Sequence, residues 1–213
     1  MGRDKIWLDV GGVPLLGHTL AAVAAAGLFE SITVVVPRAA WDAVRDLAGA
    51  AGVADLRLVE GGVRRQDSVR AGLELVGAAT LVCVHDAVRP LCPPALFAAV
   101  VDAARRLGAA TAAIPVVDSV KRVHREGPLS TVAETLERAD LVAVQTPQAF
   151  DTALLRRAHA AALRDGVFAD DDCALVEHLG APVAVVEGDP RNLKVTRPAD
   201  LAVLRAALDD GEG

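Results

Sequence analysis

The feature that most constrains the fold is a regular alternation of short apolar runs with longer Ala/Leu-rich stretches. The runs are continuously apolar, as in strands buried on both faces, and the stretches between them have helical spacing. This order predicts an α/β fold with a mostly parallel sheet covered by helices on both faces. We expect strands over 32–36, 56–59, 80–84, 111–116, 183–186 and 193–195, and helices over 14–28, 38–51, 68–76, 94–107, 151–163, 171–179 and 199–208.

One segment, residues 118–144, interrupts this alternation. It is polar, contains Gly127 and Pro128, and lacks a helical stripe. We interpret it as an excursion from the sheet, a short hairpin or arm, within a single domain spanning residues 1–213.

Composition and charge exclude several classes of function. The formal net charge is −6, which disfavours binding to a nucleic-acid backbone. The apolar runs are too short or too interrupted to span a membrane, and charges break the N-terminal segment where a signal peptide would be apolar. Three cysteines, Cys83, Cys92 and Cys173, lack metal-ligand spacing and indicate reduced thiols. We expect a cytoplasmic protein without nucleic-acid or membrane partners.

Polar residues follow several predicted strands. They are Gly61 and Gly62, residues 85–89, Asp118 with Lys121, and Asp189 with Lys194. In open α/β sheets, ligands bind at the carboxyl ends of the strands. Because these residues recur at that edge, the sequence predicts one binding site there.

A series of short motifs occurs along nearly the whole chain. They are residues 5–8 (KIWL), 11–16 (GGVPLL), 61–69 (GGVRRQDSV), 85–90 (HDAVRP), 118–121 (DSVK), 145–150 (QTPQAF), 171–172 (DD) and 192–196 (NLKVT). In order and spacing this series resembles the 2-C-methyl-D-erythritol 4-phosphate cytidylyltransferases of the non-mevalonate isoprenoid pathway. The resemblance implies a Rossmann-like nucleotidyltransferase fold of the nucleotide-diphospho-sugar transferase type, with a protruding dimerisation arm.

The resemblance also implies a reaction. A methylerythritol phosphate oxygen attacks the α-phosphorus of CTP, giving the CDP-linked alcohol and pyrophosphate. Such chemistry needs aligned reactants and positive charge near the transferring group. By resemblance, Lys5 and Lys194 supply catalytic charge, and Mg²⁺ or another divalent cation on the triphosphate supplies more.

Binding roles follow from the same resemblance. Gly61, Gly62, Ser68 and Asp86 are expected at the nucleotide, and Asp86 also near Mg²⁺. A glycine backbone approaches a flat base closely, whereas Ser68 alternatively caps the following helix. Relatives often carry an acidic residue where Val63 stands, so base recognition is expected to rest on backbone groups.

Arg89, Lys121 and Thr135 are assigned to the second substrate. The resemblance brings Thr135 from a partner's arm, which implies a homodimer with arm exchange. Some relatives carry a contacting arginine where this chain has Thr152. An Asp118–Lys121 ion pair is the structural alternative for Lys121.

Three other features have structural alternatives. An internal ion pair is the alternative for Asp86 with Arg89, and His85 is interpreted as a core histidine without a proton-transfer role. Asp171 and Asp172 are expected to interact with a helix dipole.

The family normally begins with a strand and a Gly-rich phosphate loop, whereas this sequence starts in register with the tail of that loop. We expect Met1 to be internal, with about twenty residues preceding it. Without them, we expect exposed edges on neighbouring strands and turnover at least about a hundredfold lower.

Two other functions stay open: a ribitol 5-phosphate cytidylyltransferase, and a catalytically impaired nucleotide-binding paralogue. The absence of a G-x-G-x-x-G motif after a strand disfavours a dinucleotide-binding oxidoreductase.

Overall fold

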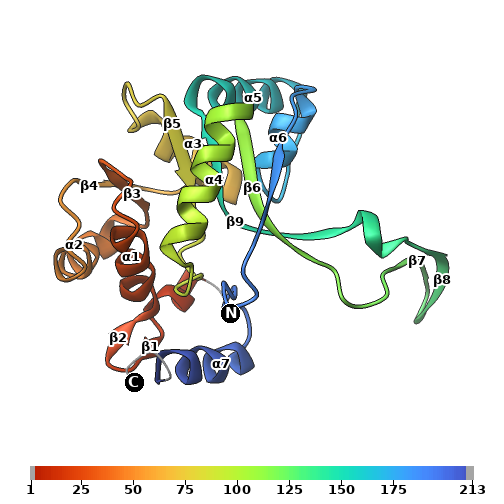
Figure 1. Cartoon of the computed structure of the whole chain (residues 1–213), viewed down its shortest axis with the longest axis horizontal. Coiled ribbons are helices and arrows are strands. Elements are labelled where there is room, and N and C mark those ends of the chain that lie inside the picture. Colours follow the sequence, from red (N-terminus) through yellow and green to blue (C-terminus); the bar gives the residue numbers. More distant parts are fainter. Residues whose placement is uncertain (1–2, 210–213) are drawn as a thin grey trace.

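The computed structural model describes residues 3–209, an α/β unit from which a two-stranded arm projects (Figure 1). Met1 and Gly2, which bear on the expected upstream segment, lie outside this range. The elements are η1 (Arg3–Trp7), β1 (Asp9–Val10), β2 (Val13–Pro14), α1 (Leu15–Ala25), β3 (Ile32–Val35), η2 (Arg38–Ala40), α2 (Trp41–Ala50), β4 (Leu56–Val59), α3 (Arg65–Glu74), β5 (Leu81–Val84), α4 (Pro94–Leu107), β6 (Ala109–Pro115), β7 (Lys121–Glu126), β8 (Leu129–Thr135), η3 (Arg138–Asp140), β9 (Val142–Asp151), α5 (Thr152–Asp165), α6 (Asp172–His178), β10 (Ala184–Glu187) and α7 (Pro198–Asp209).

The main sheet has the strand order β10-β6-β9-β5. β10 runs parallel to β6, but β9 runs antiparallel to both β6 and β5. The prediction of a mostly parallel sheet is therefore wrong in this part of the molecule, where the sheet is mixed. β9 lies outside the predicted strands, and Pro147 within it is unusual for a central strand.

A second, two-stranded sheet pairs β3 with β4 in parallel, with Val34 opposite Leu58. Within residues 3–209, β3 pairs only with β4 and β5 only with β9. Each of these two strands therefore has one edge without a strand partner among the described residues.

Helices cover both faces of the main sheet, as predicted. On one face Phe150 of β9 packs with Leu155 and Leu175 of α5 and α6. On the other, the adjacent Ala149 packs with Phe97 and Val100 of α4. Neighbouring residues of β9 thus enter opposite cores, because side chains alternate across a strand. Several of the β6 and β9 residues in these two cores are alanines.

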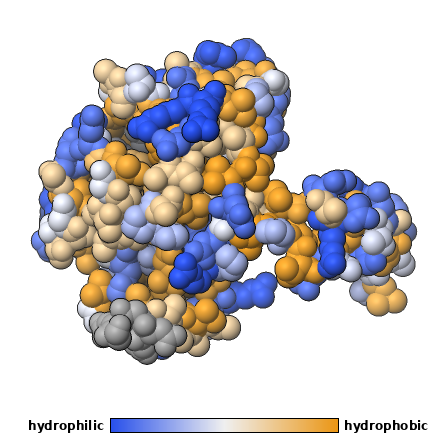
Figure 2. All heavy atoms as spheres, in the orientation of Figure 1, coloured by the Kyte–Doolittle hydropathy of each residue, from blue (hydrophilic) through white to orange (hydrophobic). Residues whose placement is uncertain are grey.

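The arm consists of β7 and β8, joined at Gly127, whose φ is +66°. All residues of both strands are exposed, and Leu129 and Val132 retain 78% and 62% of their accessible surface. Figure 2 shows apolar and polar residues mixed over the arm. It lies within the predicted excursion 118–144, and it has no core of its own.

The prediction of a strand over 193–195 is wrong. This segment is irregular and docks through one backbone hydrogen bond, from Val195 N to Val88 O at 2.9 Å. It therefore lies on the loop that follows β5. Along residues 3–209, no helix combines the length and apolar character needed to cross a membrane.

Candidate active site

The centre of the candidate site is the carboxylate of Asp86, in the loop after β5. Lys194 Nζ lies 3.0 Å and Arg89 Nε 3.3 Å from Asp86 Oδ2. Arg65 Nε lies 4.0 Å from Oδ1. The four side chains come from α3, from the loop after β5 and from the segment after β10. The fold thus gathers three cations around one anion.

The loop that carries Asp86 is fixed by its neighbours. The backbone N–H of Asp86 donates to the Thr146 hydroxyl of β9 at 2.9 Å, and the N–H of Arg89 donates to the Asp86 carbonyl at 3.1 Å. The antiparallel strand β9 therefore helps to build the site. Thr146 belongs to the QTPQAF motif, from which no role for its hydroxyl was predicted.

The charge state of Asp86 follows from its surroundings. Burial, the largest single influence, raises the pKa of Asp86, but Lys194, Arg89 and Arg65 together outweigh it. The pKa therefore lies below its usual value, because three cations favour the ionised form. The carboxylate stays charged and orients the cations at neutral pH.

Arg89 is a buried member of this cluster. Its Nη1 donates to the Asn192 carbonyl at 2.7 Å. Asn192 is itself fully buried and donates from Nδ2 to Thr146 O at 2.8 Å and to Gln145 Oε1 at 3.2 Å. These bonds hold the segment that carries Lys194 against β9. Lys194, by contrast, keeps 46% of its side-chain surface exposed and can reach a ligand.

The glycines of the predicted nucleotide loop pack against α3. A Cβ on Gly61 would lie 2.8 Å from Ser68 Oγ, and one on Gly62 would collide with Asp67 Cβ. The Ser68 hydroxyl donates to the Arg64 carbonyl at 3.1 Å, whereas Asp67 accepts from the Arg64 N–H at 3.3 Å. Capping by Ser68 is therefore wrong, because Asp67 caps this helix. A role for the three residues at the nucleotide stays a prediction.

Lys5 lies in η1, beside the site but not in the cluster. Ile6 and Trp7 pack in the same apolar cluster as Ala87, which places η1 near the loop after β5. Among the described residues, no ion pair or hydrogen bond joins Lys5 to Asp86. The structure thus brings together Lys194, Asp86 and Arg89, with Lys5 nearby and uncoupled.

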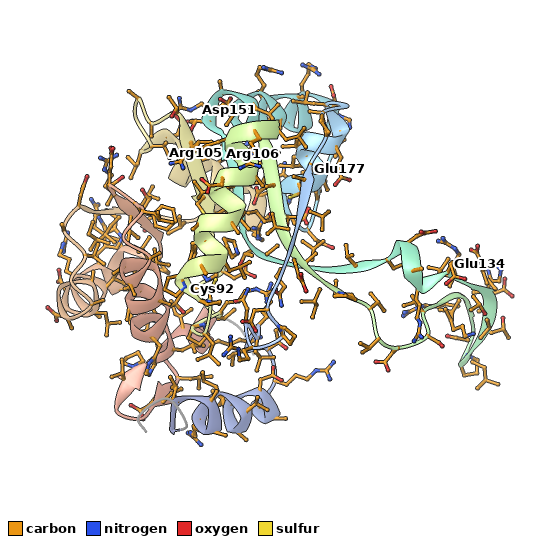
Figure 3. All side chains as sticks on the ribbon, viewed as in Figure 1. Cys92, Arg105, Arg106, Glu134, Asp151 and Glu177 are labelled. Carbon is orange, nitrogen blue, oxygen red and sulfur yellow. The ribbon has the colours of Figure 1, made fainter. Side chains whose placement is uncertain are left out.

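Lys121 and Thr135 lie on the arm, as does Glu134, which Figure 3 labels there. Lys121 Nζ donates to Thr135 Oγ1 at 2.7 Å. The alternative Asp118–Lys121 ion pair is wrong, since Lys121 bonds across the hairpin instead. Both residues are exposed, on the arm that projects from the α/β unit (Figure 1).

Two expectations for polar residues have clear outcomes. His85 is half-buried and packs against Phe97, with Nε2 3.1 Å from the Arg89 carbonyl, and loss of hydration lowers its pKa to about 4. It packs as a core histidine, as predicted. Asp171 caps α6 by accepting from Ala174 N at 3.0 Å, whereas Asp172 is buried against Arg65 and His159. The predicted interaction with the helix N-terminus therefore describes Asp171. It does not describe the main contacts of Asp172, which are with Arg65 and His159.

The three thiols, Cys83, Cys92 and Cys173, are free. Burial raises the pKa of each, that of Cys92 to about 12, so they remain protonated and are poor nucleophiles.

A sheet with helices on both faces, and arginine and lysine side chains gathered beyond the carboxyl end of β5, are the features expected of a nucleotidyltransferase. Residues 1–210 match the model of the family described as IspD, 2-C-methyl-D-erythritol 4-phosphate cytidylyltransferase. The chain belongs to this family.

Individual relatives agree with the family model. The 2-C-methyl-D-erythritol 4-phosphate cytidylyltransferase of Syntrophus aciditrophicus is 41% identical over 214 residues, covering 99% of this chain and 90% of the relative. A bifunctional enzyme IspD/IspF of Anaeromyxobacter sp. is 43% identical over 209 residues, and the match covers 98% of this chain and 54% of that enzyme. The chain therefore spans about half the length of the bifunctional relative.

A solved structure gives the same result. The crystal structure of 2-C-methyl-D-erythritol 4-phosphate cytidylyltransferase from Thermus thermophilus superposes with a TM-score of 0.82 at 40% identity, covering 96% of this chain and 94% of that one.

Proposed function

We propose that this chain transfers the cytidylyl group of CTP to 2-C-methyl-D-erythritol 4-phosphate. A phosphate oxygen of the alcohol substrate forms a bond to the α-phosphorus of CTP, the bond to the bridging β-phosphate oxygen breaks, and pyrophosphate leaves with that electron pair. The observation that carries the proposal is the convergence of Lys194, Arg89 and Arg65 on Asp86, in a member of this family.

The cluster fits phosphoryl chemistry. Transfer of a phosphoryl group needs little covalent help from the protein but much positioned positive charge. The Asp86 carboxylate holds the cations in place before substrate arrives, and exposed Lys194 is the cation that reaches the transferring group. Lys5, Gly61, Gly62 and Ser68 are proposed to complete the nucleotide side.

Mg²⁺ is proposed to accompany the triphosphate. Within residues 3–209, no group of three or more His, Cys, Asp or Glu side chains is arranged to hold a metal ion. The residues therefore fit an ion that retains water and phosphate ligands and takes one carboxylate, Asp86. When bound, the ion would neutralise phosphate charge.

A homodimer is proposed to complete the site. The exposed arm, with Thr135 and Lys121 at its base, fits a partner's surface better than solvent, because Leu129 and Val132 are otherwise unburied. Thr135, Lys121 and Arg89 would then face the alcohol substrate. The free thiols suit a reducing compartment, and we therefore place the protein in the cytoplasm.

A substrate panel tests the reaction. The purified chain is incubated with Mg²⁺ and CTP, UTP or ATP, with either methylerythritol phosphate or ribitol 5-phosphate, and pyrophosphate release is measured. We expect release with CTP and methylerythritol phosphate above all other pairs. Preference for ribitol 5-phosphate would contradict the assigned acceptor, and CTP binding without pyrophosphate release would contradict catalysis.

A further inference from the structure

A buried ion-pair chain extends from the Asp86 cluster into the helices behind it. Arg65 Nη1 donates to Asp172 Oδ2 at 2.7 Å, and the other oxygen of Asp172 lies 3.1 Å from His159 Nε2. Arg65 begins α3, His159 lies in α5 and Asp172 begins α6. Three helices therefore meet through one carboxylate.

Both carboxylate oxygens of Asp172 are used in these contacts. Its side chain is 1% exposed and each of its oxygens has one cationic or ring N–H partner. A buried carboxylate is costly to desolvate, and an apolar trio of similar volume often stabilises a protein as well or better. Stability alone is thus a weak reason for this arrangement.

Of the three side chains Arg65, Asp172 and His159, the guanidinium of Arg65 is the one that reaches solvent. It keeps 31% of its side-chain surface exposed and lines a hollow of about 300 Å³ with Arg64, Gln66 and Phe168. Nη1 is taken by Asp172, and Nε faces Asp86 at 4.0 Å. Arginine has five N–H donors in a rigid fork, so fixing one nitrogen sets the direction of the others.

We propose that Asp172, backed by His159, is a positioning residue that holds the Arg65 guanidinium beside Asp86, where Arg65 contacts a phosphate of the bound substrates. The inference rests on the proposed function for its substrates and goes beyond it by assigning Arg65, Asp172 and His159. A displacement of about 1 Å in such a group is enough to slow an enzyme about a hundredfold.

The test compares Arg65→Met, Asp172→Asn and their double variant. We expect each single variant to lower kcat/KM for pyrophosphate release by about ten- to a hundredfold, and the double variant to match Arg65→Met, because Asp172 acts through Arg65. Asp165→Asn is the matched control, since Asp165 also bridges an arginine and a histidine but lies on the surface of α5. It should leave kcat/KM unchanged.

Two outcomes would overturn the proposal. One is an Asp172→Asn protein with a lower melting temperature but unchanged kcat/KM, which indicates a purely structural role. The other is a double variant whose losses add. If Asp172→Asn does not fold, His159→Gln replaces it, with a smaller expected loss in the same direction.

Anion binding separates this proposal from the reaction itself. Calorimetry with inorganic tripolyphosphate measures how much the Arg65 guanidinium contributes to anion affinity, without any turnover. We expect Arg65→Met and Asp172→Asn to weaken tripolyphosphate binding by similar factors, whether or not the chain releases pyrophosphate from CTP. Equal binding by wild type and both variants would reject the positioning role while leaving the proposed function intact.

Discussion

Asp86 shows how single residues create the site. It is one carboxylate among Lys194, Arg89 and Arg65, and it is held by a backbone bond to Thr146. Its position after an apolar strand, and the motif around it, predict a functional loop. The Arg65–Asp172 contact could not be predicted, because the two residues are 107 positions apart and meet only after their helices pack.

The depressed pKa of Asp86 predicts how stability depends on pH. An unfolded Asp titrates near about 3.9. A lower folded pKa contributes stability above that value, and the contribution is lost as pH falls through the folded pKa. The free energy of unfolding lost by Asp86→Asn, on the order of 2 kcal/mol at neutral pH, should therefore shrink in acid.

Urea unfolding of wild type and Asp86→Asn from about pH 7 to about pH 3 measures this difference. Asp42→Asn is the control, because Asp42 pairs with Arg45 on the exposed surface and should matter little. A difference that stays constant or grows towards low pH would contradict the assigned charge state.

At the scale of elements, strands with continuous apolar sequences and helices that end at a glycine could be predicted. The helix α4, for example, spans the expected residues 94–107 and ends at Gly108. The long strand β9 was missed, because Pro147 and polar Gln145 and Gln148 hide its buried character. For the segment 193–195 the sequence predicts a strand because apolar residues flank Lys194. In the structure the segment is irregular and is held by the Asn192 side chain and one backbone hydrogen bond. Tertiary contacts decide both cases.

Asn192 therefore carries a prediction about the segment that bears Lys194. Asn192→Ala removes the donor to Thr146 O and Gln145 Oε1, which remain buried, and should cost about 1–3 kcal/mol of unfolding free energy. Gln145→Ala, which keeps the Thr146 bond, should cost less. Urea denaturation ranks the two variants, and a larger loss in Gln145→Ala would contradict this account of the docking.

At the scale of the whole molecule, the arm carries apolar side chains that the single chain leaves exposed. A hairpin of this kind is predictable from the break in the α/β alternation at 118–144, but its partner is not, because no contact within residues 3–209 covers Leu129 or Val132. We propose that a second copy of this chain buries these two side chains.

The substitution Leu129→Glu tests this proposed dimer contact. Leu129 is 78% exposed in the chain, so the substitution should leave the monomer folded but place a charge in the proposed dimer contact. Sedimentation should show dissociation at concentrations where wild type is dimeric. Leu163→Glu is the control, at an exposed position of α5 away from the arm. A monomeric wild type, or a Leu129→Glu dimer as strong as wild type, would contradict arm exchange.

The central claim is that the cations around Asp86 act on the transferring phosphorus. The most direct measurement is kcat for pyrophosphate release from CTP and methylerythritol phosphate by Lys194→Met, with Arg106→Met on the exposed side of α4 (Figure 3) as the control. We predict a loss of about a hundredfold or more in Lys194→Met, which should stay folded with a lower melting temperature because Asp86 loses its Lys194 partner, and no loss of kcat in Arg106→Met. A folded Lys194→Met protein that turns over like wild type would contradict the claim.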